Sequence, residues 1–253
     1  MINDTIAIIA DIHGNIDALE AALEDIDKQH ISKIYCLGDL IGIGPFTNEV
    51  LACLTERNDI SSIIGNHEES ILALKRGEPY PERSRKVRPH HEWIAENLDS
   101  YFIPWLENLP RREKIIWGGL TLLLQHYHLR SDKELLSIAE NPYEPVDYNP
   151  SLAKIEEFYS REEIDADLVC FGHHHPVHLY KTQNRIYLNP GALGCYHKPL
   201  ARYAVVHNYN NDLSVALKEV PYNNENLLSA YEKWDVPKKD YILSTFHSQT
   251  PFY

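Results

Sequence analysis

Basic residues are scarce in this sequence of 253 residues. Lys and Arg total 24 against 37 Asp and Glu, which gives a formal net charge of −13. A surface this acidic repels polyphosphate backbones, so the composition argues against general nucleic-acid binding. It does not exclude a small phosphorylated substrate, because metal ions or a local basic patch can attract one.

Cysteines are also few, and long hydrophobic runs are missing. The cysteines lie far apart without CxxC spacing, a pattern that favours a reduced cytosolic protein over a disulfide framework. The N-terminal stretch has no basic region, and its apolar run of about six residues is too short for an export signal or a membrane span. We therefore expect a cytoplasmic protein that is not inserted in a membrane. The four cysteines are Cys36, Cys53, Cys170 and Cys195.

What the sequence does contain is an ordinary globular composition, with 43% hydrophobic and 24% charged residues. Near the N-terminus, short β-branched runs alternate with segments of helical periodicity, in the order 5–10, 15–28, 33–38, 47–57 and 61–65. Thr47 is the expected N-cap of the second helix. Strands that alternate with helices of this length predict βαβ units around a buried parallel sheet, hence an α/β fold.

The rest of the chain extends this pattern. A polar stretch from about residue 75 to 112 has helical character around 91–106, which predicts a small helical insertion. Residues 114–126 predict two strands joined by a tight hairpin at Gly118-Gly119. Four further strands and then a helix, followed by an irregular tail, are expected at 167–172, 185–190, 202–208, 213–220 and 225–234. Without a repeat or linker to divide it, the chain is expected to form a single domain, residues 1–253.

Polar residues follow five of the predicted strands. They are Asp11 with His13, Asp39, the run from Gly65 to Glu68, His126, and Gly172 with His173. Because the ligand crevice of an open α/β sheet lies beyond the carboxyl ends of its strands, we expect these side chains at one rim. Each motif alone has a structural explanation as a helix cap, a turn or a hydrogen-bonded core histidine. All five together, each at a strand end, are poorly explained by turns.

The last of these motifs is FGHHHP, residues 171–176, with three adjacent histidines. In an extended segment successive side chains point to opposite faces, so His173 and His175 would share one side and His174 the other. Two imidazoles that converge from a short loop suggest a metal site. Taken alone, the run is equally consistent with a histidine-rich surface loop.

Taken in order, the motifs resemble those of the calcineurin-like metallophosphoesterases: Asp11-x-His13, Gly38-Asp39, Gly65-Asn66-His67-Glu68, His126 and Gly172-His173-x-His175. The resemblance covers roughly residues 5 to 208. It implies a four-layer α/β/β/α sandwich of two mixed sheets flanked by helices. The stretch GDLIGIGPFTNEVLACL further resembles a bacterial and archaeal branch related to diadenosine tetraphosphate hydrolases and small phosphodiesterases.

Phosphate ester cleavage needs neutralised phosphoryl oxygens and a strong nucleophile at neutral pH. Two metal ions about 3.5–4 Å apart, with a hydroxide shared between them, supply both. The resemblance implies that Asp39 bridges the two ions. It also implies that His174 is not a ligand, and that the ligand sets are completed by Asp11, His13 and His175 for one ion and by Asn66, His126 and His173 for the other. This donor mixture suits Mn, Fe or Zn better than Ca, without a choice among the three.

Several other residues near the motifs have two alternative roles or a role that is left open. The resemblance implies that His67 faces the substrate as a general acid, the alternative being a histidine that supports the ligands. Glu68 either orients a metal-binding histidine or caps the following helix. His128 and His197 leave open a further metal or phosphate contact. The segment 189–192 resembles the family's NPGS, but Ala192 replaces the serine and Cys195 follows, which puts any hydroxyl contact there in doubt.

A basic cluster lies within the insertion. Five of the 24 basic residues fall between positions 76 and 88: Arg76, Arg83, Arg85, Lys86 and Arg88. One hypothesis is that the insertion overhangs the metal ions and grips a polyphosphate, with Arg85 and Arg88 as substrate-binding candidates. The alternative is a solvated loop. Three aromatic residues are candidates either for stacking on a base or for the core of the insertion: Tyr80, Trp93 and Tyr101.

The function we expect is that of a metal-dependent phosphoesterase acting on small phosphodiesters or nucleotides, including dinucleoside polyphosphates. A protein Ser/Thr phosphatase is the first alternative, although members of that class tend to be longer and carry arginines beside the metal motifs, where Glu69 and Ser70 stand here. A catalytically inert scaffold is the second, although such relatives usually lack a ligand or the GNH histidine. The expected partner is a small phosphorylated substrate, and the oligomeric state is left open.

Overall fold

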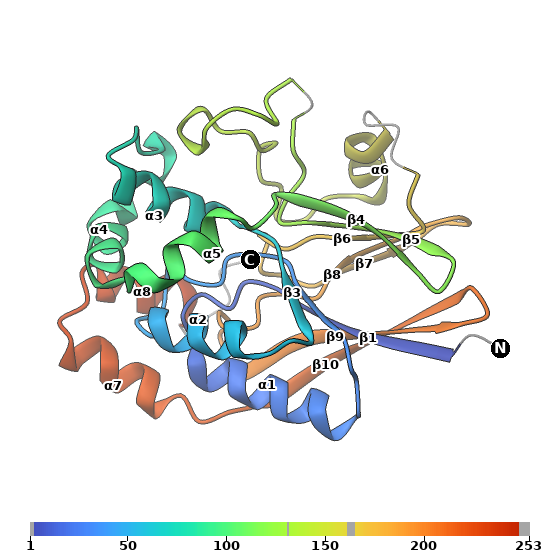
Figure 1. The fold of residues 1–253 in the computed structure, drawn as a ribbon, viewed down its shortest axis with the longest axis horizontal. Helices are drawn as coiled ribbons and strands as arrows, with labels where there is room; N and C mark the ends of the chain where they lie inside the picture. The colour runs from blue at the N-terminus through green and yellow to red at the C-terminus, as the bar shows by residue number, and fades with distance from the viewer. Residues whose placement is uncertain (1–2, 131, 161–164, 248–253) are drawn as a thin grey trace.

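Two five-stranded sheets form the centre of the molecule in the computed structural model, which describes residues 3–130, 132–160 and 165–247 (Figure 1). The first sheet has the order β10-β9-β1-β2-β3. Strands β1, β2 and β3 run parallel to one another, β9 pairs antiparallel with β1, and β10 pairs antiparallel with β9. Its strands are β1 (Asn3–Ile9), β2 (Ile34–Cys36), β3 (Ile60–Ser62), β9 (Leu200–Tyr209) and β10 (Asp212–Pro221).

The second sheet has the order β4-β5-β6-β8-β7. Its central strands β5, β6 and β8 are parallel, and the two edge strands pair antiparallel with their neighbours. The strands are β4 (Arg112–Trp117), β5 (Leu120–Gln125), β6 (Leu168–Cys170), β7 (His178–Lys181) and β8 (Ile186–Asn189). Both sheets are therefore mixed, as expected for the α/β/β/α sandwich.

Helices cover the outer faces of both sheets and gather at one end of them (Figure 1). Helices α1 (Ile16–Lys28) and α2 (Thr47–Glu56) cover the first sheet, and α6 (Leu152–Ser160) covers the second. The remaining helices are α3 (Asn66–Arg76), α4 (Arg88–Asn97), α5 (Ile103–Glu107), α7 (Glu225–Lys233) and α8 (Lys239–Phe246), with 3₁₀ turns at Glu82–Val87, Ser100–Phe102 and Ile138–Glu140. Among the described helices, none combines the length and the apolar content that crossing a membrane requires.

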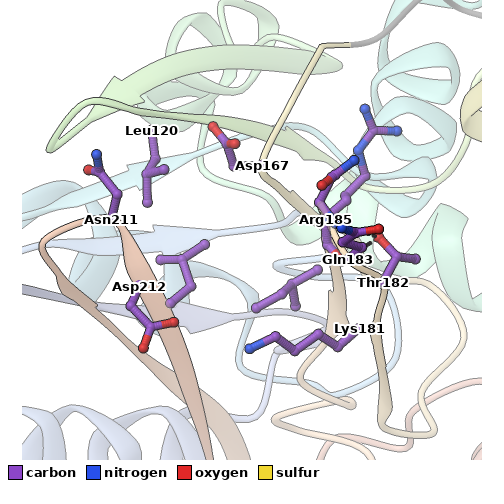
Figure 2. A pocket seen from close by; sticks show the side chains of 11 residues that line it. Leu120, Asp167, Lys181, Thr182, Gln183, Arg185, Asn211 and Asp212 are labelled. Atoms are coloured by element: carbon purple, nitrogen blue, oxygen red, sulfur yellow. Dashed lines mark hydrogen bonds between the residues drawn. The ribbon is translucent and has the colours of Figure 1, made fainter.

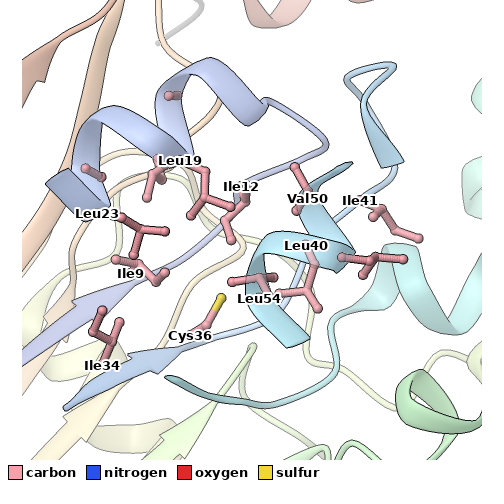
Figure 3. Close-up of a cluster of buried hydrophobic side chains, with 14 of the residues drawn as sticks. Ile9, Ile12, Leu19, Leu23, Ile34, Cys36, Leu40, Ile41, Val50 and Leu54 are labelled. Atoms are coloured by element: carbon pink, nitrogen blue, oxygen red, sulfur yellow. The ribbon is translucent and has the colours of Figure 1, made fainter. Parts of the chain in front are cut away.

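Alternation along β1 divides its side chains between two cores. Ile9 faces α1 and α2, where it packs with Leu23 and Leu54 (Figure 3). Ile8 faces the second sheet, where it packs with Leu122. Both isoleucines are fully buried, and burial of each contributes about 1.5–3 kcal/mol. Strand β1 is thus held from both sides, which fixes the position of the loop that follows it.

The predicted helices α1 and α2 form, but α2 begins differently from expectation. Asn15 caps α1, because its side-chain oxygen accepts a hydrogen bond from the Ala18 N–H at 3.1 Å. The prediction of Thr47 as N-cap is wrong: Thr47 is the first helical residue, and the cap position belongs to Phe46. The Phe46 ring packs edge-on against Trp234 at 5.3 Å, so tertiary packing sets where this helix begins.

The hairpin and the insertion form as predicted, while the C-terminal region differs. Gly118 and Gly119 have φ values of 56° and 87°, the left-handed pair that a tight hairpin requires. Residues after α7 are not irregular throughout, since they form α8. Strand β7 was not predicted either. Both elements are short, and each gains its stability by packing on a neighbour rather than from its own pattern.

Candidate metal centre

The seven predicted ligands lie together at one rim of the two sheets. Each follows or flanks the carboxyl end of a parallel strand: Asp11 and His13 after β1, Asp39 after β2, Asn66 after β3, His126 after β5, and His173 and His175 after β6. Backbone hydrogen bonds tie these loops to one another, because the Asp11 N–H donates to Gly38 and the His13 N–H donates to Asp39. The rim is therefore one connected structure, to which both sheets contribute.

Left-handed backbone is concentrated at this rim. Five of the seven predicted ligands have a positive φ: Asp11 at 55°, His13 at 52°, Asp39 at 51°, His173 at 68° and His175 at 65°. Such conformations are uncommon outside glycine, and each costs on the order of 1–3 kcal/mol unless the surroundings impose it. The run of three histidines is therefore not an extended segment, contrary to expectation. Non-glycine residues held this way cluster at functional sites.

One half of the rim converges on His126, which is fully buried. Its Nδ1–H donates to the Leu37 carbonyl at 2.8 Å, so its Nε2 points into the site. Around that Nε2 lie the Asn66 Oδ1 at 3.1 Å, the His173 Nδ1 at 3.1 Å and the Asp39 Oδ2 at 3.2 Å. Oxygen and nitrogen atoms gathered this closely in a buried place must share protons or a metal ion, and this group could hold a metal ion.

The other half converges on His13 in the same way. Its Nδ1 donates to the Ile41 carbonyl at 3.3 Å, which leaves Nε2 directed at His175 Nε2, 3.0 Å away. The Asp11 and Asp39 carboxylates each lie 3.8 Å from that His13 nitrogen. A histidine that donates its second ring N–H to a backbone carbonyl is the usual arrangement in metal sites. Both halves therefore fit metal ions, and Asp39 belongs to both.

Burial and charge shift the pKa values of the rim residues. Burial raises the pKa of Asp11 to about 7, with His126 opposing the shift. Burial also acts against ionisation of Asp39, yet the neighbouring His126 and His67 hold its pKa well below its usual range. Burial lowers the pKa of His126, but the Asp39 charge outweighs it and raises that pKa to about 9. Of the two rim aspartates, Asp39 is therefore the one that its neighbours keep ionised despite burial.

His67 and Glu68 begin α3 beside the ligands. The Glu68 carboxylate is fully buried and accepts backbone N–H groups of Gly65, Asp39 and Ile41 at 2.8–3.0 Å. It therefore caps the helix and also anchors the Asp39 loop. The His67 Nε2 lies 3.9 Å from the Asp39 carboxylate, and its Nδ1 lies 2.9 Å from the Nε2 of His91.

The three other histidines considered in the sequence analysis lie outside this rim. His174 is buried behind it, with its Nδ1 3.2 Å from His178 Nε2 and its ring against Tyr127. His128 stacks on Phe158 under α6. His197 packs against the neighbouring Tyr196 ring at 4.0 Å.

The segment that follows β8 supports the histidine loop from behind. The Asn189 side chain donates to the Gly172 carbonyl at 2.8 Å, and the Ala192 N–H donates to the His175 carbonyl at 2.9 Å. The Cys195 thiol lies near the ring nitrogens of His13 and His175, close enough to make a third candidate ligand group with them. At position 192, where the family has a serine and this chain an alanine, the contact with the histidine loop is made by the backbone N–H and not by a hydroxyl.

A cavity of about 140 Å³ opens above the ligands. Asp39, His67, His173 and His175 line its floor, and two aromatic residues, Tyr148 and Phe246, lie at its walls together with Ile43. The Phe246 ring of α8 packs on His175 at 5.6 Å.

Sequence reasoning missed several residues of this site: His91, Tyr148, Cys195 as a candidate ligand, and Phe246. Each lies on a segment whose position relative to the strands no periodicity reveals. Cys195 alone had a signal, since it follows the family-like segment 189–192 closely.

The sequence matches one protein family and several individual proteins. Residues 5–212 match a family described as the calcineurin-like phosphoesterase superfamily domain. The chain is 26% identical to an uncharacterized protein of Methanocaldococcus jannaschii, over 92% of this chain and 93% of that protein. It is 32% identical to a symmetrical bis(5′-nucleosyl)-tetraphosphatase of Acidovorax ebreus over 120 residues, which is 47% of this chain and 42% of that protein. The chain thus spans less than half the length of that relative.

Solved structures share the fold. A hypothetical protein from Pyrococcus horikoshii superimposes with a TM-score of 0.78 at 19% identity, over 98% of this chain and 99% of that one. A metallophosphoesterase from Sphaerobacter thermophilus gives a TM-score of 0.70 at 23% identity, over 95% and 97% of the two chains. At these identities the likeness shows the same sandwich and not the same substrate.

Proposed function

This chain belongs to the calcineurin-like phosphoesterase superfamily, and from that premise we propose that it is a metal-dependent phosphohydrolase of small phosphodiesters or nucleotides. The observation that carries the proposal is the rim itself. Buried carboxylate, amide and imidazole acceptors from both sheets point at one another around Asp39 and call for cations there.

The proposed metal ligands are the seven predicted from the sequence. Asp11, His13, Asp39 and His175 would hold one ion, and Asp39, Asn66, His126 and His173 the other, with Asp39 shared. When bound, the two ions would neutralise charge on the phosphoryl oxygens and lower the pKa of a water between them. The mixed nitrogen and oxygen donors favour Mn, Fe or Zn.

The protein's own groups would carry the remaining steps. His67 has its Nε2 directed to the cavity, where it would protonate or stabilise the departing alkoxide. Burial lowers the pKa of His67, with Asp39 opposing that shift, so the ring releases a proton readily but must first take one up at Nε2 before it can act as an acid. Asp39 also accepts the His67 backbone N–H at 3.0 Å, which ties this histidine to the shared ligand.

A cationic side chain beside the rim, that of Arg83, supports the proposal that the substrate is phosphorylated. The Arg83 guanidinium lies 5.8 Å from the centre of the Tyr143 ring, and that ring stacks on His173. Tyr143 is held in place by Glu69, which accepts its hydroxyl proton at 3.1 Å and pairs with Arg111. A second phosphate attached to a substrate in the cavity would therefore find Arg83 within reach, and the tetraphosphatase relatives make nucleoside polyphosphates a substrate class to test.

The two arginines selected from the sequence are placed differently. Arg85 pairs with Glu82 at 3.1 Å, and Arg88 pairs with Glu92 at 2.8 Å, both on exposed parts of the insertion. Their substrate role stays a prediction. Kinetics of Arg83→Ala beside the Arg85→Ala, Arg88→Ala double variant would separate the two possibilities, since only the residue that contacts phosphate should raise KM for nucleotides.

The function is tested by metal analysis followed by a substrate panel. The purified protein is loaded with Mn, Fe or Zn and assayed on bis-p-nitrophenyl phosphate, diadenosine tetraphosphate, ATP, cyclic nucleotides and a phosphopeptide. We expect metal-dependent hydrolysis of the diesters or nucleotides. Hydrolysis of the phosphopeptide alone would instead support a protein phosphatase, and a metal-loaded protein inert on the whole panel would support a scaffold.

A further inference from the structure

The His67 imidazole lies between the metal rim and the helical insertion. On one side its Nε2 is 3.9 Å from the Asp39 carboxylate, and on the other its Nδ1 is 2.9 Å from His91 Nε2. His91 lies on α4, 24 residues further along the chain, and is 1% exposed. Its second ring nitrogen, Nδ1, lies 2.8 Å from the Tyr80 hydroxyl. Both nitrogens of His91 are therefore engaged in one chain of hydrogen bonds.

The donor and the acceptor of each of these hydrogen bonds are assigned by starting from Tyr80, the last member of the hydrogen-bonded series. The Tyr80 hydroxyl donates to the Ser84 carbonyl at 3.2 Å, and a carbonyl can only accept. When its one proton is on that carbonyl, the Tyr80 oxygen accepts from the Nδ1–H of His91, and this is the arrangement that the ring spectra below test. The Nε2 of a neutral His91 then carries a lone pair, which accepts the Nδ1–H of His67. The Nε2 of His67 is left to face the cavity, where it takes up the proton that it gives to the leaving group while the Nδ1–H stays bonded to His91.

Gly42 makes room for this contact. A Cβ at position 42 would lie 2.2 Å from the Nδ1 of His67, and Gly42 has a φ of 111° that disfavours other residues. A side chain there would displace the His67 ring itself from the position in which it contacts His91.

From this geometry we infer that His91, with Tyr80 behind it, is a positioning residue that fixes the orientation and tautomer of His67. The inference rests on the proposed function for its catalytic consequence, although not for the tautomer itself. The helical insertion is thereby part of the active site through its buried face, whatever its exposed arginines do.

The tautomer is tested directly by long-range ¹H–¹⁵N correlation spectra of the histidine rings at a pH where His67 is neutral. We expect the Nδ1–H form of His67 in the wild type and a mixture of both forms in His91→Phe. His91→Gln should restore the Nδ1–H form, because its amide oxygen can accept from His67 while its amide N–H donates to Tyr80. An Nε2–H form in the wild type would overturn the inference.

The catalytic consequence is tested by comparing leaving groups. His91→Phe should lower kcat about 10–100-fold on a dinucleoside phosphate, which releases an alkoxide, with KM and metal content unchanged. The loss on bis-p-nitrophenyl phosphate should be only a few-fold, because its phenolate needs little protonation. His90→Phe is the matched control, since His90 is also 1% exposed on α4 but stacks on Trp93. Equal losses on both substrates, or an equal loss in the control, would contradict the inference.

These experiments distinguish a protein that lacks the proposed phosphohydrolase activity from one in which His91 does not orient His67. A wild-type protein inactive on both of these diesters and on the whole substrate panel would remove the proposed function, while its ring spectra would still decide the tautomer. A wild type that is active with an Nε2–H His67 would leave the function standing and remove the role of His91.

Discussion

The two ends of the parallel strands differ in what they present. At the carboxyl ends, buried acidic and imidazole side chains crowd around a cavity of about 140 Å³. At the opposite ends, a cavity of about 440 Å³ opens between the starts of β5, β6, β8 and β10 (Figure 2). The larger cavity has polar walls, and Asp167 lines it together with Lys181 and Arg185.

Two polar side chains at the larger cavity form hydrogen bonds with backbone groups. The Asp167 carboxylate accepts the Thr121 N–H at 2.8 Å, and the Arg185 Nε donates to the Ala166 carbonyl at 2.7 Å. At the small cavity, by contrast, acceptors face acceptors around Asp39. Unbalanced acceptors at a buried place, rather than volume, therefore mark the site where a cation and a phosphate belong.

Replacing one aspartate at each end should show the largest contrast. Asp39→Asn removes the shared ligand charge, so we expect loss of bound metal and a fall in kcat/KM of roughly 10⁴-fold, about 5.5 kcal/mol. Asp167→Asn keeps an oxygen that can accept the Thr121 N–H, so its metal content and kinetics should match the wild type. Equal effects from the two variants would erase the distinction between the ends.

His67→Ala should separate metal binding from catalysis within the rim. The variant loses the proposed acid while the seven ligands remain, so we expect kcat to fall by about 10²-fold or more with two metal ions still bound. Metal content and turnover are measured on the same preparation. Turnover equal to that of the wild type would remove His67 from the mechanism, and metal loss would make it a ligand instead.

Glu68→Gln should weaken the rim through the Asp39 loop. An amide cannot accept all three backbone N–H groups that the carboxylate accepts, so about 1–3 kcal/mol of the free energy of unfolding should be lost. Metal affinity should fall about 10–100-fold. Glu82→Gln, which removes only an exposed pair with Arg85, is the control and should lie within about 1 kcal/mol of the wild type in urea denaturation.

His178→Gln should have the smallest effect, visible only as a change in pH dependence. Burial lowers the pKa of His178 to about 4, below the usual 6.5, so the unfolded chain takes up a proton first as the pH falls. Stability that is complete above pH 6.5 is then lost towards pH 4, by about 2 kcal/mol at pH 5.

Glutamine does not titrate, so urea unfolding of His178→Gln should show less destabilisation between pH 7.5 and pH 5 than the wild type does. A His178→Gln variant with the same pH dependence as the wild type would mean that this histidine is not kept neutral by the fold.

Much of the rim could be predicted because strand ends are local features. A β-branched run followed by Asp11 or Asp39 places that aspartate at the carboxyl edge whatever the remainder of the chain does. The same locality explains why the buried face of α1 was predictable, since Leu19 and Leu23 recur at helical spacing.

The surroundings of the rim could not be predicted because they depend on packing between distant segments. The α8 helix has eight residues, and its Tyr241 and Phe246 contact Lys86 and His175 from elsewhere in the chain. The contact between His67 and His91 joins two helices whose relative placement no local pattern encodes. The left-handed backbone of His173 likewise reflects the acceptance of its N–H by Asp11, not its own propensity.

Anomalous X-ray diffraction from manganese-soaked crystals tests the central claim most directly. We expect two peaks of anomalous density at the carboxyl ends of the strands, with the Asp39 carboxylate between them. No density there, or density only at the opposite ends beside Asp167, would contradict the assignment of this rim as a two-metal centre.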